Sequence, residues 1–122
     1  MTTQVYLSTG VPDLDGIMKG GIPRGSLTLI MGVPGSGKTT LASQIAFASA
    51  HAGSTVLILT ALSESTNKLL EHLRDFTFFD PDLIGGRVQF FSLQSALQSG
   101  LRGTRDAVLQ MARQIKADMV VL

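Results

Sequence analysis

The stretch that decides the fold is "SLTLIMGVPGSGKTTLASQIAF", residues 26–47. It begins with a short apolar run at 26–32, which predicts a β-strand covered on both faces. It continues into a helical pattern in which Leu41, Ile45 and Ala48 fall on one face. Three glycines and a single lysine lie between the two patterns. A simple strand-to-helix turn needs only one or two glycines, so this composition calls for a chemical explanation.

The glycines and the lysine follow the order G-x-x-x-x-G-K-T, which is typical of a phosphate-binding loop. Glycine lets the backbone curl so that consecutive amides point at an anion, and the helix N-terminus adds its dipole. Lys38 is expected to contact the β- and γ-phosphates of ATP, and the Thr39 hydroxyl to bind Mg²⁺. The alternative is a glycine-rich turn with a solvated lysine. The predicted nucleotide-binding residues are Gly32, Val33, Pro34, Gly35, Ser36, Gly37, Lys38, Thr39 and Thr40.

The composition indicates a small globular domain and excludes several classes of function. The 122 residues are 44% apolar and 16% charged, with a net charge of +1. Without cysteine the chain has no disulfide, thiolate metal site or catalytic thiol. Its charges are scattered, so they do not indicate nucleic-acid or membrane binding. No apolar run approaches about 18 residues and no signal-peptide pattern is present, so a cytoplasmic protein is expected.

Apolar runs and helical patterns alternate along the rest of the chain. Further short apolar runs predict strands at 55–62, 88–93 and 118–122. Helical periodicity between them involves Leu69, Leu70, Leu73 and Phe76 in one segment, and Val108, Met111, Ala112 and Ile115 in the next. The alternation predicts an α/β fold, a three-layer sandwich around a mostly parallel sheet. Segment 94–103 is expected to be a polar loop.

Other polar residues are weaker candidates for chemistry. Glu64 follows the second predicted strand, where it could position the attacking water or, alternatively, interact only with a helix N-terminus capped by Ser65. His51 and His72 have no partner at ligand spacing and are expected on the solvated surface. Asp118 precedes an apolar run, so we expect it to be the polar first residue of a strand, away from Mg²⁺.

Two motifs before residue 26 indicate a resemblance to a known family. Residues 9–15, "TGVPDLD", and residues 20–25, "GGIPRG", lead directly into the phosphate-loop stretch. In this arrangement the chain resembles the RecA-like ATPase core, in particular the branch that includes KaiC and RadA. Leu14 and Asp15 are the most conspicuous pair of the first motif. The resemblance implies a RecA-like P-loop NTPase fold.

The resemblance also bears on the catalytic residues. The family's second strand commonly ends in two acids followed by Ser or Thr, and here Glu64 and Ser65 match the second acid and its follower, whereas Ser63 replaces the first acid. Lys38 and Glu64 are therefore the predicted catalytic residues. In the family an aspartate that holds the water shell of Mg²⁺ follows a strand of the type "ADMVVL", but the sequence ends at Leu122. A further strand, encoded later, is expected between the phosphate-loop strand and 118–122. Residues 1–122 are thus expected to be the N-terminal part of a single, truncated ATPase domain.

The leading functional hypothesis is a module that binds ATP with Mg²⁺ and hydrolyses it when complete, coupling the nucleotide to rearrangement of subunits or partners. One alternative is a signalling or scaffold module that binds nucleotide without turnover. Another is a DNA recombination or repair ATPase, although this segment gives no indication of nucleic-acid binding. A homo-oligomer is expected from the ring or filament habit of the resembling family and from the exposed strand edge that a missing strand would leave.

Overall fold

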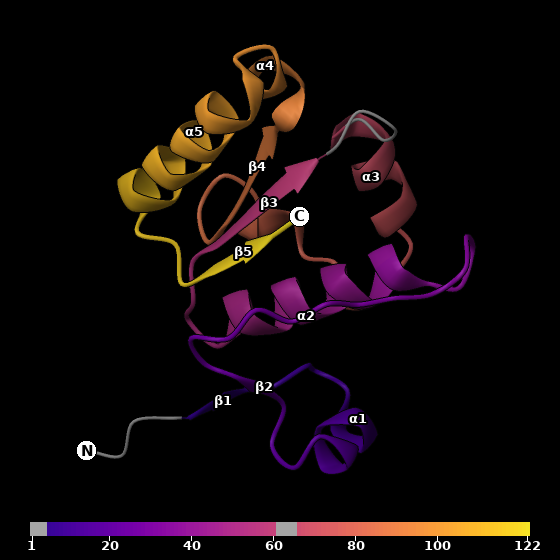
Figure 1. The fold of residues 1–122 in the computed structure, drawn as a ribbon. Helices are drawn as coiled ribbons and strands as arrows, with labels where there is room; N and C mark the ends of the chain where they lie inside the picture. Colours follow the sequence, from indigo (N-terminus) through magenta and orange to yellow (C-terminus); the bar gives the residue numbers. More distant parts are fainter. Residues whose placement is uncertain (1–4, 61–65) are drawn as a thin grey trace.

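The computed structural model describes residues 5–60 and 66–122. It contains two short strands and a short helix near the N-terminus, followed by an alternation of longer helices and strands (Figure 1). In chain order the elements are β1 (Tyr6–Leu7), α1 (Pro12–Ile17), β2 (Ile22–Pro23), α2 (Lys38–His51), β3 (Val56–Thr60), α3 (Thr66–Leu73), a 3₁₀ turn (Pro81–Leu83), β4 (Val88–Ser92), α4 (Leu93–Leu97), α5 (Gly100–Ile115) and β5 (Met119–Val121).

A parallel three-stranded sheet forms the middle layer, in the order β4-β3-β5. Val56 on β3 is in register with Val88 on one side and with Met119 on the other. Helix α2 lies against one face of this sheet and α5 against the opposite face (Figure 1). The predicted α/β class, the three layers and the parallel direction of the strands are confirmed. The strands predicted at 55–62, 88–93 and 118–122 are present with narrower bounds.

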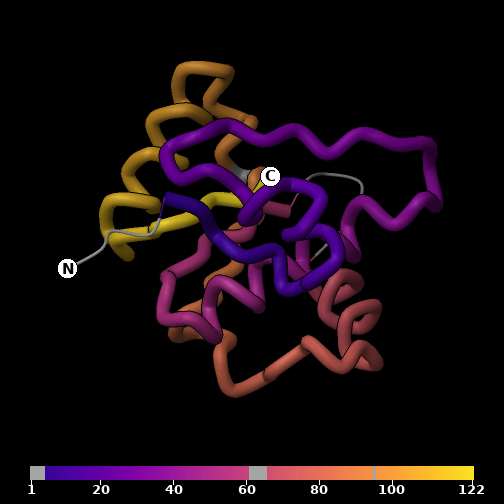
Figure 2. The backbone as a smooth tube through the Cα atoms, turned by 90° about the horizontal axis from the view of Figure 1, so that it is seen from below, coloured from indigo at the N-terminus to yellow at the C-terminus, as the bar shows by residue number. Residues whose placement is uncertain are grey.

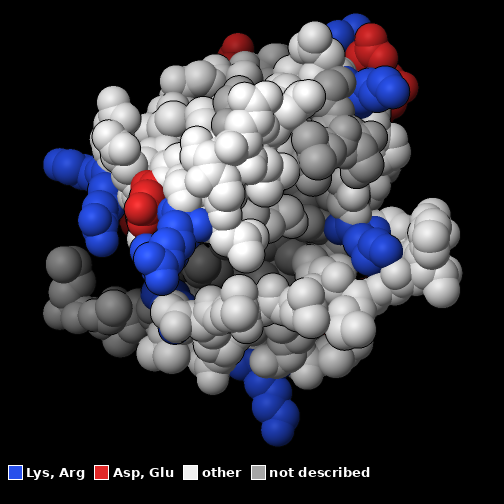
Figure 3. All heavy atoms as spheres, turned by 45° about the horizontal axis from the view of Figure 1, so that its top comes forward, with Lys and Arg blue, Asp and Glu red and all other residues white. Residues whose placement is uncertain are grey.

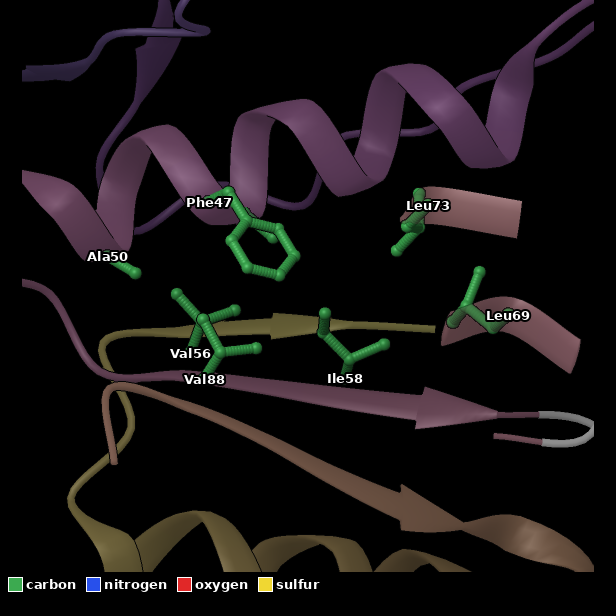
Figure 4. Packing of buried hydrophobic residues seen from close by; sticks show 8 residues of the cluster. Phe47, Ala50, Val56, Ile58, Leu69, Leu73 and Val88 are labelled. Atoms are coloured by element: carbon green, nitrogen blue, oxygen red, sulfur yellow. The ribbon is translucent and has the colours of Figure 1, made fainter. Parts of the chain in front are cut away.

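The main core lies between the sheet and the helices α2 and α3, because these elements carry the apolar side chains that face each other (Figure 4). Phe47 and Leu73 are fully buried there. The other buried members are Ala46, Ala50, Val56, Ile58, Leu69 and Val88. Leu69 and Leu73 confirm the predicted apolar face of α3, but Phe76 lies beyond the end of that helix and is 37% exposed. The prediction that Phe76 shares this helical face was wrong.

The prediction of a strand at 26–32 was also wrong. This segment runs beside α2 without entering a sheet and forms part of a wide loop that turns back into the helix (Figure 2). Leu27 is 98% exposed, Leu29 78% and Met31 80%. A strand is stabilised by hydrogen bonds to a neighbouring strand, and no strand of the described residues pairs with this segment. Residues 26–32 therefore have the apolar pattern of a strand, but among the described residues they have no partner strand.

An open groove of about 600 Å³ separates this segment from β5. Residues 24–30 line one side, residues 118–122 line the other, and Ala42 and Ile45 of α2 also contribute to its wall. Within the described residues β5 pairs only with β3, so its other edge faces this groove. The groove lies where the RecA-like resemblance implies an additional strand.

Segment 94–103 is helical, which corrects the prediction of a polar loop. The side chain of Ser92 accepts a hydrogen bond from the Gln94 amide at 3.3 Å, so a helix begins directly after β4. Ala96 is only 7% exposed. The Thr104 hydroxyl donates to the Ala96 carbonyl at 3.0 Å and thereby ties α5 to α4. The cap formed by Ser92 and the burial of Ala96 stabilise a helix here despite the polar composition on which the loop prediction was based.

Candidate nucleotide-binding site

The predicted phosphate loop leads directly into α2, as its sequence requires. Lys38 is the first residue of the helix, and Gly37 is its N-cap, with φ of 97°. Gly35 has φ of 81°. Both values lie in the left-handed region, which glycine adopts without steric cost. A Cβ at either position would meet nothing within 4 Å, so backbone conformation rather than crowding explains these two glycines.

At Gly32, crowding rather than backbone conformation requires a glycine. A Cβ at this position would lie 2.5 Å from the Ser36 hydroxyl oxygen, because the loop folds back over its own beginning. The Ser36 amide donates to the Val33 carbonyl at 3.1 Å and closes a turn inside the loop. The three glycines of this stretch, two of them specified by the motif, therefore support one tight loop.

Lys38 reaches back over this loop. Its ammonium donates to the Gly32 carbonyl, with Nζ 2.5 Å from the oxygen. This bond holds a positive charge at the loop, at the N-terminus of a helix whose dipole also attracts anions. A bound phosphate would be expected to draw the ammonium away from the carbonyl, since an anion is the stronger acceptor.

The N-terminus of α2 is open to a ligand. Its N-cap residue is a glycine, which has no side chain to cap it, and its first turn contains no acidic residue. The amides at a helix start have no intrahelical acceptor, so an anion is a suitable partner for them. Thr39 is exposed, which leaves its hydroxyl accessible to a cation beside the phosphates, while the Thr40 hydroxyl lies 3.1 Å from Nε2 of His72 on α3. These residues fit a magnesium–nucleotide complex.

The motif at residues 9–15 forms a hydrogen-bonded cluster around Asp15. Asp15 accepts bonds from the Ser8 hydroxyl at 2.5 Å, the Thr9 hydroxyl at 2.6 Å and the Thr9 amide at 2.8 Å. These bonds, the Ser8 bond above all, lower the pKa of Asp15 below its usual value. Thr9 is fully buried, and a Cβ on Gly10 would lie 2.7 Å from Cβ of Ala48 on α2. The motif therefore fixes the N-terminal segment against the helix that carries the phosphate loop.

The remaining candidates have structural roles or lie outside the described residues. Glu64, with Ser63 and Ser65, falls in the undescribed range 61–65. His51 is exposed and lies 3.7 Å from the Asp80 carboxylate. Asp118 accepts from the Thr55 amide at 2.9 Å at the start of β5, as predicted for a polar first residue.

Residues 5–60 and 66–122 contain neither a cluster of metal ligands nor a membrane-spanning helix. No group of three or more His, Asp or Glu side chains gathers there as a metal site would require. None of the helices in this part of the chain has both the length and the hydropathy needed to cross a membrane.

Sequence reasoning missed one contact at this site, the hydrogen bond between Thr40 and His72. The two residues are 32 positions apart, and no spacing rule connects a loop threonine to a histidine in a different helix. Only the packing of α3 against the core brings them together.

A parallel α/β sandwich with a glycine-rich loop entering a helix at Gly-Lys-Thr is typical of the P-loop NTPases. A family model described as "ATPase: KaiC" matches residues 7–84, which is more than half of the chain. The chain belongs to this KaiC ATPase family.

Curated relatives agree with this assignment. The chain is 46% identical over 55 residues to the DNA repair protein RadA of Mycolicibacterium smegmatis, a match that covers 45% of this chain and 12% of that protein. It is 37% identical over 70 residues to the circadian clock protein KaiC3 of Synechocystis, a match that covers 57% of this chain and 14% of that protein. A UPF0273 protein of Methanocaldococcus jannaschii is 34% identical over 70 residues, covering 57% and 29%. The chain thus spans less than a third of the length of each of these relatives.

Proposed function

We propose that this protein binds ATP with Mg²⁺ through residues 32–40 and that, as part of a complete ATPase domain, it hydrolyses the nucleotide. The observation that carries the proposal is the uncapped N-terminus of α2, reached through Gly35 and Gly37 in left-handed conformation. Lys38 adds the positive charge, held beside the loop by the Gly32 carbonyl. Loop amides, helix dipole and ammonium together provide a site for a polyphosphate.

Each residue of the loop has a chemical task in this proposal. Lys38 leaves the Gly32 carbonyl and contacts the β- and γ-phosphates, where it stabilises the charge that develops during transfer. The Thr39 hydroxyl holds Mg²⁺, which when bound neutralises charge on the same phosphates. The backbone from Gly32 to Gly37 surrounds the phosphate chain. Residues 1–122 then form the N-terminal part of one RecA/KaiC-like ATPase domain.

Glu64 is the proposed hydrolytic carboxylate. It follows β3 by four residues, and the carboxyl ends of parallel strands face the crevice in which ligands of α/β sheets bind. From such a position a carboxylate orients or deprotonates the water that attacks the γ-phosphate. Ser63 stands where the resembling family commonly has the first of its two acids, which favours slow turnover.

Coupling to other subunits is the remaining part of the proposal. The exposed apolar side chains of Leu27 and Leu29 lie across the groove from an edge of β5 that no described strand pairs with, and they favour association with further polypeptide. The relatives named for DNA repair and for the circadian clock indicate the range of processes that such a module serves. On the face that Figure 3 shows, Lys and Arg are dispersed and form no basic patch of the kind that favours a nucleic-acid partner.

The experiment compares the parent chain with two variants. Lys38→Ala should weaken ATP binding about ten- to hundredfold in calorimetry with Mg²⁺, because it removes a charge-assisted contact. Glu64→Gln should retain binding and reduce any phosphate release about 10²-fold or more. A parent chain that takes up neither ATP nor ADP would refute the proposal, and binding without turnover by the complete ATPase domain would favour the scaffold alternative.

A further inference from the structure

His72 makes a contact that the phosphate loop itself does not explain. Its Nε2 lies 3.1 Å from the hydroxyl oxygen of Thr40, in the first turn of α2. Thr40 directly follows Thr39, the proposed magnesium ligand. The contact therefore joins α3 to the turn of α2 that begins the nucleotide site.

The imidazole is held in place by a row of aromatic rings that starts in the core. His72 meets the ring of Phe76 edge-on, with centroids 5.5 Å apart. Phe76 stacks on Phe78 at 5.3 Å, and Phe78 lies 6.1 Å from the buried Phe47. Although His72 is exposed, its ring is thus supported by packing that continues into α2. Such support limits the rotamers available to the imidazole.

The rest of α3 also links His72 to the site. Leu69 and Leu73 are 5% and 0% exposed and anchor the helix in the core. The helix begins at Thr66, immediately after the segment that carries Glu64. This short helix therefore connects the core with the first turn of α2.

We propose that His72 is a positioning residue of the nucleotide site, acting through the Thr40 hydroxyl. This inference rests on the proposed function. A threonine hydroxyl within a helix readily bonds to a backbone carbonyl three or four residues earlier. For Thr40 those carbonyls belong to Gly37 and Ser36, which are part of the phosphate loop. In this proposal the Thr40 hydroxyl donates its proton to Nε2 of His72. The hydroxyl then does not bond to the Gly37 or Ser36 carbonyl, and the first turn of α2 keeps one arrangement.

The test measures Mg-ATP affinity by calorimetry on the full chain, with urea unfolding of each variant as a parallel measure of stability. His72→Ala should weaken binding about two- to tenfold, which corresponds to the loss of one hydrogen bond. His72→Gln, whose side-chain amide can still bond to a hydroxyl, should restore part of the affinity. His51→Ala is the matched control, because His51 is an exposed histidine at the opposite end of α2 and should leave the affinity unchanged.

A double-mutant cycle separates positioning from general destabilisation. Thr40→Val removes the hydroxyl at nearly constant volume, and in that background His72→Ala should have little further effect on affinity. The inference is wrong if His72→Ala binds ATP as tightly as the parent. It is also wrong if the affinity lost in the double variant equals the sum of the losses in His72→Ala and Thr40→Val. In both cases the proposed function stands. Failure of the parent chain to bind nucleotide would instead overturn the proposed function, and this inference with it.

Discussion

At the scale of single residues, Asp15 shows what a family motif does physically. Its carboxylate accepts three hydrogen bonds from Ser8 and Thr9 and so ties a loop to the start of α1. From the sequence alone, the resemblance to the family motif was the only reason to single out Asp15. The structure adds the physical one, since bonds to the ionised form hold the pKa of Asp15 below its usual value.

This shift predicts a pH dependence of stability. A carboxyl group with a lowered pKa in the folded state stabilises the fold above its unfolded pKa of about 3.9, and that contribution is lost as the pH falls through the folded value. Asp15→Asn should therefore have a lower urea midpoint than the parent at pH 7, and the difference should narrow below about pH 4. Asp13→Asn, which makes the same change in charge on the exposed side of the same helix, is the control. Equal midpoints for Asp15→Asn and the parent at pH 7 would contradict the role of the cluster.

At the scale of elements, α3 depends on two leucines more than on its own helical propensity. The helix has only eight residues, so it needs tertiary packing to be stable. Leu69 and Leu73 supply this by entering the core beside Phe47 and Ile58 (Figure 4). The position of His72 beside Thr40 follows from the same packing.

Truncation of Leu73 should test this dependence. Leu73→Ala should lower the free energy of unfolding by about 2–5 kcal/mol, because it leaves a cavity at a fully buried position. Leu101→Ala, at a position on α5 that is 86% exposed, should change it by less than about 0.5 kcal/mol. Chemical denaturation of both variants provides the measurement. Similar losses in the two would mean that α3 does not anchor the core as described.

At the scale of the whole molecule, the open groove between residues 24–30 and β5 is the dominant feature. It exposes Leu27 and Leu29 together with an edge of β5 that no strand within residues 5–60 and 66–122 pairs with, a combination that promotes association between chains.

We expect the chain to associate increasingly as its concentration rises, and the double variant Leu27→Lys with Leu29→Lys to associate less, because lysine disfavours edge pairing and burial. Sedimentation velocity over a range of concentrations measures this. The control, Leu101→Lys, places a charge on α5 and should leave association unchanged. An equal effect of control and double variant would show that the groove is not the surface involved.

The sequence by itself determined the glycine-rich loop that enters α2, the alternation of helices and strands after it and the polar residue before β5. Glycine spacing, hydrophobic period and a residue's place before an apolar run are local properties. Tertiary structure decided the rest. Residues 26–32 have the apolar pattern of a strand, but no strand among the described residues pairs with them. Most of segment 94–103 is helical, because Ser92 caps α4 and Ala96 is buried. Thr40 meets His72 only through the packing of α3. Each of these depends on which surfaces meet in space, and no spacing along the chain specifies that.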